Sequence, residues 1–206
     1  MAPCFVITAT GTDIGKTVFA AGLCGLIDAD YWKPLQTGTA DGASDAATVA
    51  RLSGARLWPE AHALPEPLSP HRAAELAGVT IDPARLVPPQ TPAPLVIEGA
   101  GGVLVPVTRD LLSADLFARW GLPVVLVAAT GLGTISHSLT AIESLRARGC
   151  RLHGIAFVGP DNPDNIATIA QLSGARILGR LPPLDPLDRA SLAAAMAAAF
   201  RMEDFA

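Results

Sequence analysis

The chain has little charge and no long apolar run, and together these two absences narrow the class of protein. Only 17% of its 206 residues are charged, 50% are hydrophobic, and the mean hydropathy is +0.38. A membrane-spanning helix needs about 20 consecutive apolar residues, whereas the longest apolar stretch, residues 122–129, has only the length of a strand. The composition therefore favours an α/β protein whose parallel strands are buried on both faces.

Clusters of metal-binding or redox side chains are also missing. The three cysteines, Cys4, Cys24 and Cys150, share no metal-ligand or redox spacing, and such an odd, scattered set is expected of free thiols in a reducing cytoplasm. The four histidines form no ligand pair on one helix face, which argues against a histidine-bound metal. A net charge of −4 without a basic block argues against nucleic acid as the main partner. No basic region precedes the first apolar residues, so we expect neither a signal peptide nor a membrane partner.

The most informative motif is the segment Thr10-Gly11-Thr12-Asp13-Ile14-Gly15-Lys16-Thr17. An apolar run at 4–7 precedes it and a run of helical character at 18–27 follows it, which is the layout of a phosphate-binding P-loop. Backbone N–H groups and a helix N-terminus would hold the phosphates. Lys16 would reach the terminal phosphates, and the Thr17 hydroxyl would face an accompanying Mg²⁺. Because residue 10 is threonine where the general pattern has glycine, an ordinary strand–turn–helix with a surface lysine stays an alternative at this point.

Apolar runs alternate with helical patterns along the chain. This alternation predicts a single domain over residues 1–206, built as a doubly wound, mainly parallel sheet flanked by helices, of the P-loop NTPase type. We expect strands at 4–7, 30–35, 95–98, 103–107, 123–128, 152–158 and 177–181. We expect helices at 18–27, 45–52 (capped by Ser44), 73–77, 115–120, 165–172 and 190–202, and one that 131–134 opens and that runs to about 148. The proline-dense stretch 58–94 is predicted to be a long, folded connection.

Two charged residues stand at the ends of predicted buried strands, where ligands gather in parallel sheets. Lys33 is a poor choice for a buried strand unless it faces a charged ligand, and Glu98 stands where a Mg²⁺-facing carboxylate would lie. The alternatives are a solvated edge-strand lysine for Lys33 and, for Asp45, a carboxylate that only complements a helix dipole.

Five segments in chain order, with one shorter one, resemble the dethiobiotin synthetase family over nearly the whole chain, from about residue 5 to about 184. They are Thr12-Asp13-Ile14-Gly15-Lys16-Thr17, Trp32-Lys33-Pro34-Leu35-Gln36-Thr37-Gly38, Ser44-Asp45-Ala46, Glu98-Gly99-Ala100-Gly101-Gly102, Leu132-Gly133-Thr134-Ile135-Ser136-His137 and the shorter Pro67-Leu68-Ser69-Pro70-His71.

The resemblance implies a Mg²⁺-dependent cyclo-ligase of biotin biosynthesis. Such an enzyme converts 7,8-diaminononanoate, CO₂ and a nucleoside triphosphate, expected to be ATP, into dethiobiotin, nucleoside diphosphate and phosphate. A carbamate forms on one amine, the γ-phosphoryl group activates it as a mixed anhydride, and the second amine closes the ring. The family also implies a homodimer with sites at the subunit interface.

The roles of single residues are likewise implied by the resemblance. Catalysis would involve Thr12, Lys16 and Lys33. The nucleotide would contact Asp13, Ile14, Gly15, Lys16, Thr17, Val18, Asp45, Glu98, Gly99, Ala100, Gly101, Pro182, Pro183 and Leu184. Mg²⁺ would be held by Thr17, Asp45 and Glu98. The diamine or its carbamate would contact Thr12, Lys33 and Thr37, and the substrate carboxylate would reach Gly133, Thr134 and Ser136 at a helix N-terminus, in the family from the neighbouring subunit.

One departure from the family concerns the base of the nucleotide. The family often has an Asn-Asp pair after the strand that corresponds to 152–158, and its amide reads adenine. This chain has Val158-Gly159-Pro160-Asp161-Asn162, without that pair in register. We therefore predict weaker discrimination among nucleoside triphosphates than the family's Asn-Asp pair would give.

Three other classes of protein share part of this pattern. Switch ATPases of the partitioning type often carry a second lysine early in the loop, where this chain has Thr10, Gly11 and Thr12. An amidotransferase-type ligase of cobalamin synthesis would need a glutaminase domain, for which 206 residues leave no room. A non-enzymatic nucleotide-binding module is the third, and the pairing of Lys33 with Glu98 argues against it.

Overall fold

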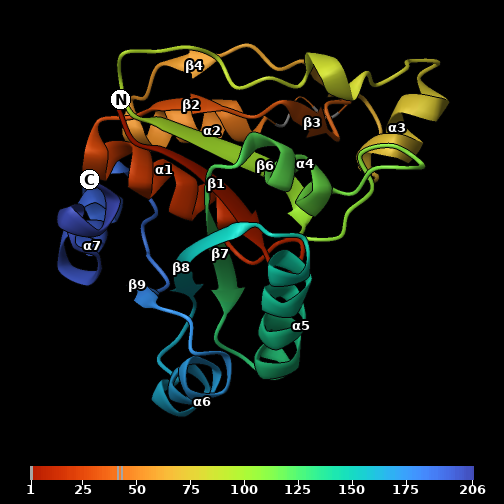
Figure 1. Ribbon diagram of the computed structural model, residues 1–206. Coiled ribbons are helices and arrows are strands. Elements are labelled where there is room, and N and C mark those ends of the chain that lie inside the picture. Colours follow the sequence, from red (N-terminus) through yellow and green to blue (C-terminus); the bar gives the residue numbers. More distant parts are fainter. Residues whose placement is uncertain (1, 41, 43) are drawn as a thin grey trace.

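A parallel sheet forms the centre of the protein (Figure 1). The computed structural model describes residues 2–40, 42 and 44–206. Within these residues the sheet has seven strands, and every neighbouring pair is parallel. In sheet order they are β4 (Leu57–Trp58), β2 (Asp30–Trp32), β6 (Leu95–Gly102), β1 (Cys4–Ala9), β7 (Pro123–Ala129), β8 (Arg151–Val158) and β9 (Ile177–Leu181).

Helices cover both faces of this sheet. Alternate residues of β1 point to opposite faces, so that Phe5 and Ile7 pack into one apolar cluster and Val6 into another. The first cluster lies under α1 (Lys16–Ile27), α2 (Asp45–Ser53) and α7 (Arg189–Ala199). The second lies under α4 (Ser113–Trp120), α5 (Thr134–Ala147) and α6 (Pro163–Ser173). The predicted doubly wound, mainly parallel architecture is therefore confirmed.

The predicted strand 30–35 is wrong in one respect, because it is broken at Lys33 and Pro34. Proline has no N–H to donate to a sheet, and the Pro34 carbonyl accepts the N–H groups of Ala61 and His62 at 2.9 and 3.0 Å. The chain therefore leaves the main sheet after β2 and continues as β3 (Leu35–Thr37). This strand pairs in parallel with β5 (His62–Leu64) in a separate two-stranded sheet. The break leaves Lys33 between two strands rather than inside one.

The proline-dense stretch is a folded connection, as predicted, and it contains more regular structure than the sequence indicated. It holds the end of β4, β5, α3 (Pro70–Leu76) and a 3-10 turn at Pro83–Arg85. Its apolar side chains bury a third cluster together with β3 and the start of α4. The short strands β4 and β5 were not predicted.

Two further predictions need correction. Residues 103–107 form a turn rather than a strand, because Val103 and Val107 are buried in two different apolar clusters and the segment crosses between them. The last helix ends at Ala199 rather than at 202, because Phe200 turns extended and packs into the core. A 3-10 turn at Met202–Phe205 then follows.

The remaining predicted elements agree with the structure to within a few residues. The predicted cap of α2 is present, since the Ser44 hydroxyl accepts the N–H of Ala47 at 3.3 Å. In the described part of the chain, no helix has both the length and the apolar character needed to cross a membrane.

Candidate functional site

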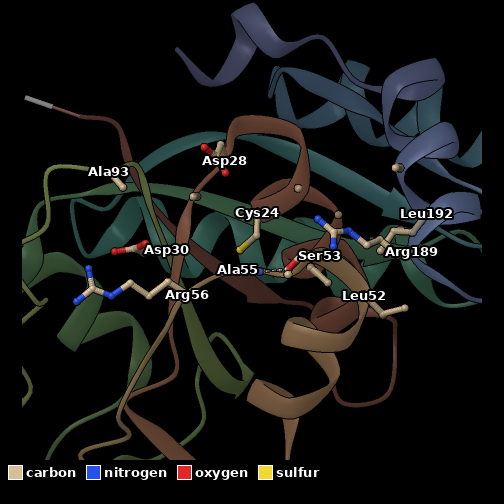
Figure 2. Close-up of a pocket in the computed structure, with 16 residues that line it drawn as sticks. Cys24, Asp28, Asp30, Leu52, Ser53, Ala55, Arg56, Ala93, Arg189 and Leu192 are labelled. Atoms are coloured by element: carbon tan, nitrogen blue, oxygen red, sulfur yellow. Dashed lines mark hydrogen bonds between the residues drawn. The ribbon is translucent and has the colours of Figure 1, made fainter.

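A cavity of about 460 Å³ lies where α1 and α2 end and α7 begins (Figure 2). Its wall includes Cys24, Asp28, Asp30, Arg56 and Arg189. Asp30 is the first residue of β2, so the cavity opens at the amino-terminal edge of the sheet, opposite the edge where ligands of parallel sheets collect. None of the predicted site residues lines it.

The opposite edge carries the P-loop segment, which connects β1 to α1. Gly15 ends this loop with φ +87°, and a Cβ there would lie 2.6 Å from Cγ1 of Val158. Both the backbone conformation and the space therefore require glycine. Among the described residues, the N–H groups of 11–18 have no protein acceptor. These unpaired donors at a helix N-terminus form a concavity suited to phosphate.

The glycine-rich end of β6 runs directly beside this loop. A Cβ on Gly102 would lie 3.3 Å from the Ala9 carbonyl oxygen and 3.7 Å from Cα of Gly11. Gly101 has φ +61°, and its Cβ would lie 2.8 Å from the Val105 side chain. The run from Gly99 to Gly102, whose only side chain is the methyl group of Ala100, therefore lets the β6 backbone lie close to the P-loop.

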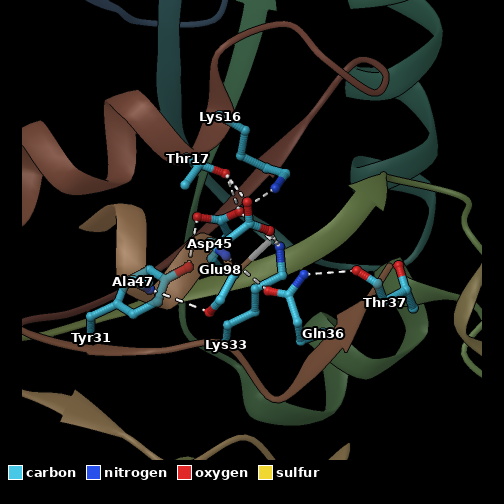
Figure 3. A network of polar contacts seen from close by, with 10 residues as sticks. Lys16, Thr17, Tyr31, Lys33, Gln36, Thr37, Asp45, Ala47 and Glu98 are labelled. Carbon is cyan, nitrogen blue, oxygen red and sulfur yellow. Dashed lines mark hydrogen bonds and ion pairs between the residues drawn. The ribbon is translucent and has the colours of Figure 1, made fainter. Parts of the chain in front are cut away.

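Charged side chains from four separate segments meet under the loop (Figure 3). Lys16 comes from the first turn of α1, Lys33 from the break between β2 and β3, Asp45 from the start of α2, and Glu98 from β6. Lys16 contacts Glu98 Oε1, and Lys33 contacts both Asp45 Oδ2 and, at 3.1 Å, Glu98 Oε1. The Thr17 hydroxyl lies 2.9 Å from Glu98 Oε1 and 3.1 Å from Asp45 Oδ1. The fold thus joins residues that are up to 82 positions apart.

This cluster balances two positive against two negative charges, and most of it is buried. Side-chain exposure is 0% for Glu98, 5% for Lys33 and 10% for Lys16, and 33% for Asp45. Burial alone would raise the pKa of Glu98, but Lys33 and Lys16 outweigh it and lower that pKa to about 2. A buried carboxylate is therefore kept ionised by its two lysines.

The two lysines differ in how firmly their charge is held. Burial lowers the pKa of Lys33, but the carboxylates of Glu98 and Asp45 outweigh it, and the net shift is upward. Burial also lowers the pKa of Lys16, which faces Glu98 together with the repelling charge of Lys33, and its net shift is downward. The net pKa shifts differ because Glu98 is flanked by two cations, whereas Lys16 has the repelling charge of Lys33 beside its carboxylate partner. Lys16 is the cation with more to gain from an additional anion.

Two side chains that sequence reasoning missed hold this cluster in place. The Tyr31 hydroxyl donates to Glu98 Oε2 at 2.9 Å. The Gln36 side chain accepts the N–H of Asp45 at 3.2 Å and donates to the Thr37 carbonyl at 2.8 Å, which ties the start of α2 to β3. The available signal was a polar group in a buried strand, since both residues are at most 6% exposed.

The oxygen atoms of the cluster fit a magnesium ion. Mg²⁺ prefers oxygen ligands and is usually bound by one or two carboxylates together with substrate phosphates and water. The hydroxyl of Thr17 and the carboxylates of Asp45 and Glu98 converge beside a concavity suited to phosphate. In the described residues, no group of three or more histidine, cysteine or acidic side chains forms a metal cage.

A small cleft separates the P-loop from the start of α5. It measures about 260 Å³, and its wall joins Thr12 and Ile14 of the loop to Leu132, Thr134 and His137. The Thr134 side chain is buried, and its hydroxyl donates to the Ala129 carbonyl at 2.5 Å. The predicted residues Thr12 and Thr134 therefore share one cleft, but the hydroxyl of Thr134 is already engaged.

The segments after β8 and β9 lie next to each other. The N–H of Gly159 donates to the Leu181 carbonyl at 3.0 Å. Arg180 donates to the Gly159 carbonyl at 3.0 Å and pairs with Asp161 at 3.2 Å. These contacts bring the turn at 159–162 beside the predicted residues Pro182, Pro183 and Leu184.

Asn162 in this turn has a structural role. Its side-chain oxygen caps α6 by accepting the N–H of Asn165 at 3.2 Å, and its side-chain nitrogen donates to the Thr130 carbonyl at 3.0 Å. Its amide is therefore occupied within the protein.

The fold and this cluster define a nucleotide-binding protein of the P-loop class. A family model described as an AAA domain matches residues 4–191. The fold resembles that of a ParA family ATPase from Chlorobium tepidum TLS, with a TM-score of 0.54 and 12% identity over 96% of this chain and 91% of that one. It also resembles the MinC:MinD cell division complex of Aquifex aeolicus, with a TM-score of 0.53 and 13% identity over 94% and 86% of the two chains. At these identities the likeness shows the fold alone.

Sequence relatives define the family more narrowly. A protein of Rhizorhabdus wittichii named ATP-dependent dethiobiotin synthetase is 57% identical, with 100% of both chains covered. One of the same name from Novosphingobium aromaticivorans is 57% identical over 98% of both chains, and one from Rhodopseudomonas palustris is 53% identical over 100% and 99%. The chain belongs to the dethiobiotin synthetase family, as its motifs predicted.

Proposed function

We propose that this protein, acting as a single domain, is a Mg²⁺- and ATP-dependent dethiobiotin synthetase. It joins CO₂ to 7,8-diaminononanoate and closes the ureido ring at the expense of ATP. Membership of the family supports the reaction. The observation that carries the assignment of the site is the meeting of two lysines, two carboxylates and a threonine under a loop with unpaired N–H donors.

Nucleotide binding rests on the P-loop and on Lys16. The backbone of Asp13, Ile14 and Gly15, with the first turn of α1 through Val18, offers N–H donors to phosphate oxygens. Lys16 leaves Glu98 and binds the β- and γ-phosphates, a step favoured because burial and Lys33 disfavour its charge in the free site. The end of β6 at 99–101 lets backbone approach the same groups, since no large side chain intervenes.

Thr17, Asp45 and Glu98 would hold Mg²⁺. When bound, this ion would supply positive charge that neutralises the phosphate oxygens and orients them for transfer. The Thr17 hydroxyl lies within 3.1 Å of an oxygen of each carboxylate, which supports this assignment.

Lys33 stabilises negative charge as the reaction proceeds. A carbamate forms on one amine, and its oxygen attacks the γ-phosphorus while the bond to ADP breaks. The second amine then attacks the carbamate carbon, and phosphate leaves with the electron pair of the C–O bond. Each step needs positioning and charge neutralisation rather than a covalent intermediate on the protein. Lys33 keeps its charge because the carboxylates of Glu98 and Asp45 flank it. Thr12 and Thr37 would contact the diamine or its carbamate.

We propose a homodimer in which the start of α5 would bind the carboxylate of the substrate that lies in the partner subunit's site. Gly133, Thr134 and Ser136 form this start. The N–H of Thr134 donates to the Gly131 carbonyl at 3.2 Å, so the donors to the carboxylate would be the N–H groups of Gly133 and Ser136 and the exposed Ser136 hydroxyl. The adjacent Leu132 side chain is fully exposed, which suits a surface that a second subunit covers. Light scattering of the purified protein tests this: a dimer is expected, and a monomer at working concentration would contradict it.

Base recognition is proposed for Pro182, Pro183 and Leu184, beside the turn at 159–162. Because the amide of Asn162 is engaged by α6 and by Thr130, we expect no side-chain amide from this turn to read adenine. The free thiols Cys4, Cys24 and Cys150 support a cytoplasmic location.

The test of the function is an assay with Mg²⁺, bicarbonate, 7,8-diaminononanoate and a nucleoside triphosphate. Phosphate release is followed while dethiobiotin is detected by mass. We expect product only when all components are present. Nucleotide hydrolysis that is indifferent to the diamine would instead favour a switch-type ATPase.

A further inference from the structure

Tyr31 is a buried hydroxyl donor on the carboxylate at the centre of the site. It is the only tyrosine in the chain, and it is fully buried. Its partner on β6 in the register of β2 and β6 is Val96, two residues before Glu98. Residues two apart on a strand share a face, so the Tyr31 ring lies along Val96 and its hydroxyl reaches Glu98 Oε2 at 2.9 Å.

The two oxygens of Glu98 have different partners. Oε1 is contacted by Lys16, Lys33 and Thr17, all residues of the site itself. Oε2 is contacted by Tyr31 alone among the described residues. Figure 3 shows Tyr31 and the two lysines approaching the carboxylate from different sides. Oε1 is therefore the oxygen whose partners change when Lys16 turns to a phosphate, whereas Oε2 keeps the same donor.

We propose that Tyr31 is a positioning residue that fixes Glu98 through Oε2, so that Oε1 faces Mg²⁺ once Lys16 has moved to the nucleotide. The inference rests on the proposed role of Glu98 as a metal ligand. A carboxylate held at one oxygen loses less freedom when its other oxygen binds a cation, and outer donors of this kind usually tune metal affinity. Without Tyr31, the side chain of Glu98 can rotate toward whichever lysine is nearer.

The test compares Tyr31→Phe, which keeps the ring and removes the hydroxyl, with a matched control. Thr91→Val removes a hydroxyl that donates at 2.8 Å to another buried carboxylate, that of Asp30, and that also accepts the N–H of Ala93 at 3.2 Å. Asp30 is the first residue of β2, whereas the hydroxyl of Tyr31 bonds to Glu98 in the site beyond the carboxyl end of β2. The control therefore reports the effect of losing buried hydrogen bonds away from the site. Both variants are expected to melt at lower temperature than the wild type.

We expect the Mg²⁺ concentration that gives half-maximal dethiobiotin formation to rise about tenfold in Tyr31→Phe, as is usual when an outer donor to a metal ligand is lost. The kcat at saturating Mg²⁺ should fall far less, and Thr91→Val should match the wild type in both. Equal Mg²⁺ dependence in Tyr31→Phe and Thr91→Val would overturn the proposal.

A second measurement needs no variant and no turnover. Because the chain has one tyrosine, ring-labelled ¹³C-tyrosine gives one set of NMR signals. We expect these signals to shift when Mg²⁺ is added to the protein with ADP, and to shift less when ADP is added with EDTA. Signals that do not respond to Mg²⁺ would refute the role of Tyr31. A wild-type protein that forms no dethiobiotin but shows the Mg²⁺-dependent shift would instead refute only the proposed reaction.

Discussion

Replacing Lys33 with glutamine separates its contribution to stability from the catalytic role that we propose for it. Glutamine keeps a polar side chain of similar length but removes the charge that lies 3.1 Å from Glu98 Oε1 and also contacts Asp45. At an effective dielectric constant of about 20, a pair at that distance attracts by about 5 kcal/mol. The burial of both groups offsets part of this attraction.

The expected loss of stability depends on the carboxylates that lose Lys33 as their partner. Breaking a buried ion pair usually costs about 3–5 kcal/mol because one charge is left without a partner. Glu98 keeps Lys16, and Asp45 is one-third exposed, so we expect the lower end, about 3 kcal/mol. For a chain of this size the melting temperature then falls by about 6–12 °C.

The catalytic loss should be larger. A donor that acts mainly on charge developing in the transition state contributes about 10²–10³-fold in kcat. Phosphate release at saturating substrates gives kcat, and calorimetric titration with ATP gives nucleotide affinity. We expect kcat to fall by about 10²–10³-fold in Lys33→Gln while nucleotide affinity changes little. Lys16→Gln should lose both, and near-normal turnover of folded Lys33→Gln would refute the assigned role.

Three other predictions can be checked separately. Glu98 has a pKa lowered from 4.5 to about 2, so its contribution to stability is present above pH 4.5 and is lost as the pH falls toward 2. Urea unfolding between pH 3 and pH 6 should therefore show a pH-dependent component of about 2 kcal/mol that Glu98→Gln lacks; parallel profiles would contradict it. Gly15→Ala should weaken ATP binding about tenfold or more because its Cβ meets Val158, whereas Gly174→Ala, with φ +60° and open space, should leave binding unchanged. Apparent KM values for ATP, CTP and GTP should be similar, and a strong preference for ATP would show that base recognition lies elsewhere.

Much of the site could be predicted because its residues stand at the ends of strands. The P-loop residues, Lys33 and Glu98 were expected near one another from the rule that parallel strands present their carboxyl ends at one edge. Asp45 was expected from the resemblance to a family. The structure brings two of the P-loop residues, Lys16 and Thr17, into contact with the cluster of Lys33, Asp45 and Glu98.

The partners of these residues were harder to predict. Tyr31 and Gln36 bond to Glu98 and Asp45 across strands and helices, through distances in sequence of 67 and 9 residues. Burial of a polar side chain in a strand does not by itself specify which atom it will meet. The same holds for Asn162, whose side chain caps α6 and donates to the Thr130 carbonyl in the structure.

The sequence by itself determined the alternation of strands and helices, the turn at Gly15 and the family to which the chain belongs. Each of these depends on local backbone preference or on residues close together in the chain. The tertiary structure alone decided that the strand at 30–35 breaks at Lys33, that residues 103–107 form a turn instead of a strand, and that Tyr31 holds one oxygen of Glu98. These features depend on which apolar surface or hydrogen-bond partner from a distant part of the chain a segment meets. The order of residues along the chain does not specify that partner.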